Sequence, residues 1–120
     1  MVQSYRDLKV WQQAIDLVIA VYPILKTFPK EEVYGLSSQI RRAAVSIPAN
    51  IAEGQARQHT KEFLQHLSIA KGSLAELDTL LIVAEKLGYV NNQEIVPIQA
   101  SMRELRMMLY GLTSRLQSKL

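Results

Sequence analysis

Hydrophobic residues recur every three or four positions over four long stretches of this chain, which is the spacing of helices that lie along one another. In the first stretch, predicted as a helix over residues 6–27, two apolar seams run side by side. One seam comprises Leu8, Trp11, Ile15, Val18, Tyr22 and Leu25, and the other comprises Val10, Ala14, Leu17, Val21, Ile24 and Phe28. Together they cover about 200° of the helix, roughly twice the stripe of a helix that packs on one side. This helix is therefore expected to have neighbours on two sides.

The same spacing predicts three further helices, over residues 36–58, 60–87 and 92–119. The third helix has an unbroken heptad seam of Phe63, Leu67, Ala70, Leu74, Leu77, Leu81 and Ala84. The fourth has a seam of Ile95, Ile98, Met102, Leu105, Leu109, Leu112 and Leu116. No strand-like alternation, internal repeat or low-complexity linker interrupts the pattern. Four helices with short connections predict one all-α domain over residues 1–120, an antiparallel up-down-up-down four-helix bundle.

The ends of the predicted helices are marked by residues that cap helices. Thr60 is the expected N-cap of the third helix, and Asn91 or Asn92 that of the fourth. Gly88 suits the left-handed position that ends the third helix, and Tyr89 can supply the apolar contact of that ending.

Three prolines fall inside predicted helices. Pro48 lies in the middle of the second, where a missing N–H and a ring clash cost ~3 kcal/mol and predict a kink. Pro23 is expected to bend the last turns of the first helix, and Pro97 makes the first turn of the fourth uncertain. A helix that is apolar on one face and broken in its middle, such as residues 39–54, indicates a buried or interface helix whose shape matters.

Composition narrows the functional classes. Hydrophobic residues make up 48% of the chain and aromatic residues only 7%, which is typical of a helical protein. The absence of cysteine excludes disulfides, thiolate metal sites and cysteine nucleophiles. The first residues carry charge where a signal peptide needs an apolar core, and no apolar run reaches membrane-spanning length. We therefore expect a soluble, cytoplasmic protein with no membrane partner.

A hairpin of the second and third helices, folded about residue 59, brings polar residues to matching heights. Residues whose numbers sum to about 118 lie level in such a hairpin, which pairs Arg42 with Glu76 and Ser46 with Gly72. Arg42 and Glu76 are expected to form an ion pair, at the side of the bundle or across a subunit boundary; the alternative is two solvated side chains. Gly72 costs ~1 kcal/mol inside a helix, so close approach of another backbone is the expected compensation.

A second group of polar residues surrounds Pro48. The proline leaves the carbonyl of Ala44 without its usual donor, and Ser46 or Asn50 could satisfy the disturbed backbone. With the residues above this predicts a structural polar network of Arg42, Ser46, Asn50, Glu53 and Glu76. A less favoured interpretation makes Asn50, Glu53 and Arg42 a ligand site, although nothing nearby completes a mechanism.

Signs of an enzyme are weak. A metal site of His59, Glu62 and His66 can be drawn, but the spacing is not that of a zinc protease, and Thr60 is expected to end helical geometry before His59. No glycine-rich phosphate loop, nucleophile elbow or carboxylate cluster is present. We expect no enzymatic activity, no metal and no cofactor.

Basic residues offer a different possibility. Fourteen Lys and Arg against eleven Asp and Glu leave a formal charge of +3. The candidates for nucleic-acid binding are two residues that flank the turn near His59 and two pairs that face different directions on the fourth helix: Arg57, Lys61, Arg103, Arg106, Arg115 and Lys119. Scattered positive charge usually keeps a helix soluble, but phosphate binding becomes possible if oligomerisation aligns the clusters.

Four segments carry a family resemblance: YRDLKVW at 5–11, FPKEEVYGL at 28–36, QIRRAAVSIPANIAEG at 39–54 and LSIAKGSLAEL at 67–77. With them the chain resembles the four-helix-bundle proteins encoded within intervening sequences of bacterial 23S ribosomal RNA genes, which are similar to accessory proteins of diversity-generating retroelements. The resemblance implies a homopentameric barrel around a central channel. For the retroelement relatives it implies binding of nucleic acid and reverse transcriptase, and for the ribosomal-insert relatives it implies no settled activity.

Two functional hypotheses follow. The first is a non-enzymatic, oligomeric bundle that binds RNA, DNA or a ribonucleoprotein through basic surface. The alternative is a protein-interaction scaffold or accessory subunit, for example for a reverse transcriptase, whose charge is incidental.

Overall fold

The computed structural model describes residues 4–120, and within them the fold is all-α with four α-helices. Their bounds are Lys9–Val21 for α1, Leu36–Ala56 for α2, Thr60–Lys86 for α3 and Asn92–Gln117 for α4. Three short 3-10 segments accompany them, η1 at Tyr5–Asp7, η2 at Tyr22–Thr27 and η3 at Lys30–Glu32. No described helix is both long and apolar enough to cross a membrane.

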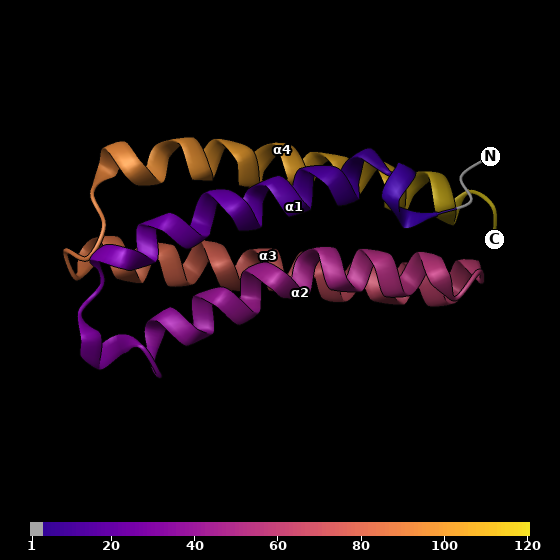
Figure 1. Ribbon diagram of the computed structural model, residues 1–120. Coiled ribbons are helices and arrows are strands. Elements are labelled where there is room, and N and C mark those ends of the chain that lie inside the picture. Colours follow the sequence, from indigo (N-terminus) through magenta and orange to yellow (C-terminus); the bar gives the residue numbers. More distant parts are fainter. Residues whose placement is uncertain (1–3) are drawn as a thin grey trace.

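The four helices run lengthwise beside one another in an elongated body of 46 × 24 × 20 Å (Figure 1). Helix α1 contacts α2 and α4, and α3 contacts the same two helices. The α1–α2 and α3–α4 connections lie at one end of the body. The α2–α3 turn lies at the other end, beside the start of α1 and the end of α4 (Figure 1).

Only one of the two apolar seams of the first helix is fully covered. Val10, Ala14, Leu17 and Val21 are buried in the core. The seam that begins at Leu8 is half-buried at Leu8, Trp11, Ile15 and Val18, exposed at Tyr22 and buried only at Leu25, beyond α1. Within a single chain, the other helices therefore cover one of the two predicted seams of α1. The other seam remains partly open to solvent.

The first helix is shorter than the predicted 6–27 because both of its ends are interrupted. Leu8 has an extended backbone, so η1 is a separate turn, and its N-cap Ser4 accepts a hydrogen bond from the Arg6 N–H. At the other end, α1 passes into η2 at Tyr22, the residue before Pro23. Pro23 has no N–H to donate to the carbonyl of Ile19, so the α-helical hydrogen bonding is interrupted there, which accounts for the change of helix type.

Pro48 and Pro97 both lie inside continuous helices. Figure 1 shows the first half of α2 sloping away from α3 and its second half running along α3, with the change of direction near the middle of the helix. This is the bend expected of an internal proline, since the ring displaces the preceding turn.

Local capping at the helix ends agrees with the sequence at two places and differs at one. Asn91 caps α4 in a capping box with Glu94, and Gly88 ends α3 with a φ of 82°. The expectation that Thr60 caps α3 is wrong: His59 has the extended N-cap backbone, and Thr60 is the first helical residue.

Helices α2 and α3 lie in close contact at Gly54. A Cβ placed there would lie 2.6 Å from the Cβ of His66 and 3.1 Å from Cδ1 of Phe63. Gly72, where close approach was expected, is exposed, and apart from its chain neighbours and the backbone of its own helix no described atom lies within 4 Å of the position that a Cβ would take there. The expectation for Gly72 is wrong within one chain because the hairpin register is shifted, and Ser46 meets Ser73 instead.

Glu32 links the α1–α2 connection to the α3–α4 connection, at the end of the bundle opposite the α2–α3 turn. Its Oε1 accepts a hydrogen bond from the Leu36 N–H at 3.1 Å, and its Oε2 accepts one from the Tyr89 hydroxyl at 3.0 Å. This hydrogen bond to a carboxylate raises the pKa of Tyr89, because it stabilises the protonated phenol. The N-terminus of α2 is thereby capped and tied to the α3–α4 connection.

We predict opposite effects for alanine at the two glycines of the hairpin. Gly54→Ala should destabilise the fold by about 1–3 kcal/mol, since its Cβ meets a backbone-proximal atom that cannot rotate away. Gly72→Ala should stabilise the fold by about 0.5–1 kcal/mol, because alanine favours a helix and the site is open. Urea denaturation followed by circular dichroism measures both, and a destabilising Gly72→Ala would show that another molecule covers this face.

Candidate functional site

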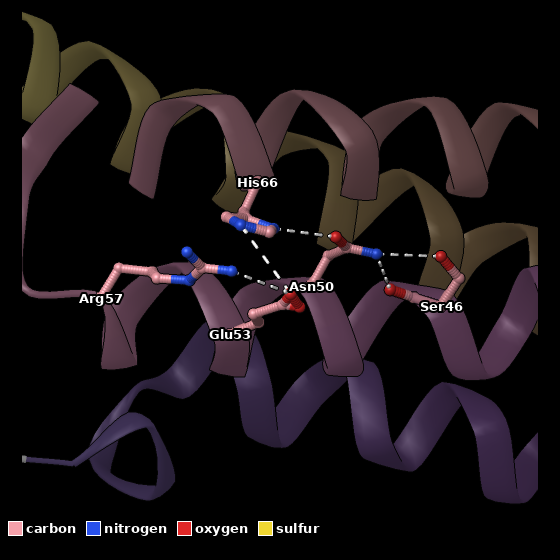
Figure 2. A network of polar contacts seen from close by, with 5 residues as sticks. All are labelled: Ser46, Asn50, Glu53, Arg57 and His66. Carbon is pink, nitrogen blue, oxygen red and sulfur yellow. Dashed lines mark hydrogen bonds and ion pairs between the residues drawn. The ribbon is translucent and has the colours of Figure 1, made fainter. Parts of the chain in front are cut away.

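A line of polar side chains, the polar seam, runs between α2 and α3. It consists of Ser46, Asn50, Glu53, Arg57, His66 and Ser73, and Figure 2 shows all of these except Ser73. Four of these residues come from α2 and its C-cap, and two come from α3. The polar seam therefore joins the two helices along the contact that includes Gly54.

The inner end of the polar seam is a pair of serines. The hydroxyl oxygens of Ser46 and Ser73 are 2.8 Å apart, and Ser73 is buried. A buried hydroxyl without a partner is destabilising, so this pairing accounts for a polar residue inside the apolar face of α3.

Asn50 sets the direction of hydrogen bonding along the polar seam. Its Nδ2 donates to the Ser46 carbonyl at 2.9 Å and to the Ser46 hydroxyl at 3.0 Å. Its Oδ1 is therefore left to accept from Nδ1 of His66, at 3.1 Å (Figure 2). The network assigns the proton of a neutral His66 to Nδ1, which leaves Nε2 unprotonated on the side of Glu53.

The outer end of the polar seam faces solvent. Glu53 Oε1 lies 3.7 Å from the Arg57 guanidinium and 4.0 Å from Nε2 of His66. Both Glu53 and Arg57 are about half exposed, so this ion pair contributes little to stability. The nearby carboxylate of Glu53 partly neutralises Arg57, so Arg57 attracts an anionic ligand less strongly.

The structure brings together part of the predicted polar network. Ser46, Asn50 and Glu53 share the polar seam, and Asn50 does support the backbone near Pro48, although at the Ser46 carbonyl and not at that of Ala44. Arg42 and Glu76 line one surface hollow of about 330 Å³, but no ion pair within 4.0 Å joins them in the described chain. Both are exposed, so within a single chain the solvated alternative holds.

His66 and Ser73 were missed as members of this network. A fold point half a residue later than the one assumed would have placed Ser46 level with Ser73 and Glu53 level with His66. The polar residue types of His66 and Ser73 were visible in the sequence. How far one helix is shifted along the other cannot be derived from the hydrophobic period of either helix.

The arrangement is poorly suited to acid–base chemistry. The Ser46 hydroxyl receives a hydrogen bond from the Asn50 amide, which cannot accept its proton and pass it to His66. The side chains of His59, Glu62 and His66 do not come together as a metal site. Within residues 4–120, no three or more His, Asp or Glu side chains lie close enough together to hold a metal ion.

All six predicted nucleic-acid candidates are exposed, but they do not form one cluster. Arg57 is the C-cap of α2 and Lys61 lies in the first turn of α3, while Arg115 lies in the last turn of α4 and Lys119 just after that helix. These four belong to the same end of the bundle (Figure 1). Arg103 and Arg106 lie farther back along α4, apart from the others.

The same end also carries Arg6 in η1 and Lys9 at the start of α1, which were not among the candidates. We call these residues the basic end: Arg6, Lys9, Arg57, Lys61, Arg115 and Lys119. They outnumber the acidic side chains of that end, Asp7, Glu53 and Glu62. At the opposite end, Lys26, Lys30 and Lys86 are accompanied by Glu31, Glu32, Glu85 and Glu94. The excess positive charge is thus concentrated at the end of the bundle that contains η1, the start of α1, the α2–α3 turn and the end of α4.

Comparison with known proteins gives one family. The family model described as 23S rRNA-intervening sequence protein matches residues 6–111. The match includes the whole polar seam and the α2–α3 turn, and it ends before Arg115 and Lys119. No curated protein matches the chain.

We predict that Asn50→Ala destabilises the fold by about 1–3 kcal/mol, because it removes the donor to Ser46 and leaves His66 without an acceptor. The matched control is Asn92→Ala, which removes one exposed hydrogen bond to Glu85 and should change stability by less than about 0.5 kcal/mol. Equal changes in the urea midpoints of the two variants would contradict a structural role of the polar seam.

Proposed function

Because the chain belongs to the 23S rRNA-intervening sequence protein family, we propose that it is a non-enzymatic protein that binds RNA, alone or in a ribonucleoprotein, through its basic end. The observation that carries the proposal is the gathering of cations from η1, α1, the α2–α3 turn and α4 at one end of the molecule. The proposed setting is the cytoplasm.

The physical basis is electrostatic attraction to phosphates. Exposed Lys and Arg side chains on several elements can reach successive phosphates of a flexible strand, and they release counterions when they do so. Such contacts carry no base information, so the expected binding is independent of sequence and sensitive to salt. DNA should therefore bind by the same mechanism, and its affinity relative to RNA reports any additional recognition.

We further propose that the antiparallel four-helix bundle assembles into a homopentamer. The partly open seam of α1 at Trp11, Ile15 and Val18 supports a second neighbour, since a helix gains stability when its apolar face is covered. Five copies of a chain with a charge of +3 would carry about +15, which strengthens attraction to a polyanion.

An accessory role toward a protein partner, such as a reverse transcriptase, is the second candidate function. Large hydrophobic side chains that are exposed in the single chain favour it, among them Ile19, Tyr34 and Met107. In that role the basic end would be incidental.

The assembly is tested by light scattering at micromolar concentration. The expected mass is close to five times the 13.6 kDa of one chain. Ile15→Glu should lower the mass while helicity is retained, because it places a charge on the open seam of α1, and Val96→Glu on an exposed site of α4 should not. A monomeric wild-type protein would rule out the pentamer.

RNA binding is tested by fluorescence anisotropy with a single-stranded oligonucleotide over a series of salt concentrations. Lys61→Ala combined with Lys119→Ala should weaken binding and flatten the salt dependence by about 0.7 per lost phosphate contact. Arg103→Ala combined with Arg106→Ala removes the same charge away from the basic end and should have a smaller effect. Absence of binding to RNA and DNA at low salt would refute the proposal.

A further inference from the structure

A groove with apolar walls lies where the end of α1 and η2 meet the outer face of α2. Its first part is a hollow of about 520 Å³ lined by Ile19, Tyr22, Pro23, Leu25, Lys26 and Arg41. The second part, of about 420 Å³, shares Tyr22 and Arg41 with the first and continues to Arg42 and Val45. Because the two hollows share these residues, they form one continuous surface, which we call the α1–α2 groove.

The apolar side chains of the groove are unusually open to solvent. Ile19 is 67% exposed, Tyr22 42% and Val45 43%. Within η2, Ile24 and Leu25 are buried in the core, whereas Tyr22 and Pro23 are exposed, as is Ile19 near the end of α1. Clustered exposed hydrophobic residues that are rimmed by polar ones are typical of an interaction surface.

The charged rim of the groove has one sign. Lys26, Arg41 and Arg42 border it, and among the described residues no carboxylate lines either hollow. Arg41 is held in place, since its Nη2 donates to the Val33 carbonyl at 3.2 Å. A fixed guanidinium beside apolar side chains is a ready partner for a carboxylate, because less side-chain entropy is lost when it binds.

We propose that the α1–α2 groove binds an acidic amphipathic helical segment of a partner protein. The lining residues of α2 extend from Ser38 to Ser46, about 12 Å of helix at 1.5 Å per residue, which matches two turns of a bound helix. Apolar side chains of that segment at positions i, i+3 or i+4 and i+7 enter the two hollows. Carboxylates on its flanks pair with Lys26, Arg41 and Arg42.

The lining favours a protein over a nucleic acid at this surface. Tyr22 is the only aromatic residue among the lining residues described, and the other apolar walls are aliphatic or proline, so the groove offers few platforms for stacked bases. A phosphate backbone would also have to be desolvated against Ile19 and Val45. The groove is at the opposite end of α1 from the basic end, so the two surfaces can act independently.

The test selects binders from a display library of random peptides about 16 residues long, enough for four helical turns. Selection uses the wild-type protein, and the enriched peptides are synthesised and measured by fluorescence anisotropy. We expect enrichment of Asp, Glu and large apolar residues at helical spacing. Lys26→Glu combined with Arg42→Glu should weaken these peptides at least about tenfold by opposing their carboxylates. Ile19→Ser combined with Val45→Ser should weaken them similarly by removing the apolar walls.

The matched control is Arg103→Glu combined with Arg106→Glu, which makes the same charge change on α4, a helix that lies outside the groove. It should leave peptide affinity unchanged, and circular dichroism melting confirms that each variant is folded. Four results would overturn the proposal: no enriched peptide, enriched peptides that are basic or uncharged, equal loss in the control, or displacement of the peptides by RNA. A lower light-scattering mass in the groove variants would also overturn it, since the groove would then join copies of this chain. RNA binding at the basic end is measured separately, so either proposal can fail alone.

Discussion

The close approach of α2 and α3 at Gly54 is the constraint on which both the polar seam and the basic end depend. With no side chain between the helices at that point, His66 comes near enough to contact Asn50 and Glu53. The chain then reverses within a few residues, where Gln58 takes a positive φ of 60°. That reversal delivers Arg57 and Lys61 to the end where α1 begins and α4 stops. The absence of a side chain at Gly54 therefore matters both for the hydrogen bonds between α2 and α3 and for the position of the basic residues at the turn that follows.

Helical periodicity predicted the four α-helices and most of the buried residues of α3 and α4, because burial follows the face of a helix, but it did not show that one seam of α1 stays partly open. It was less informative at helix ends, where local chemistry decides, as at Leu8 and Pro23. It did not predict the hairpin register, since periodicity fixes which face points inward but not how far one helix slides along another. Gly54 and Gly72 consequently look alike in the sequence, although one is enclosed and the other is open.

The candidate site was predicted in part for the same reason. Ser46, Asn50 and Glu53 were identified because they surround Pro48 on one helix. His66 and Ser73 come from the opposing helix, and only the packed hairpin shows that they complete the network. The basic end combines residues that are far apart in the chain, so pairs of neighbouring charges in the sequence did not indicate it. Their common location is a property of the topology.

The position of η1 and of the end of α4 has a practical consequence for anyone who attaches something to this protein. Both η1 and the end of α4 lie at the basic end (Figure 1), so a tag attached close to either of them is near that surface. An acidic tag there would neutralise the surface on which polyanion binding depends, and a basic one would mimic it. Tyr34, 97% exposed in the connection at the opposite end, marks a better place for a fluorophore or a fused domain. A label at that position would report on the molecule without altering its charged end.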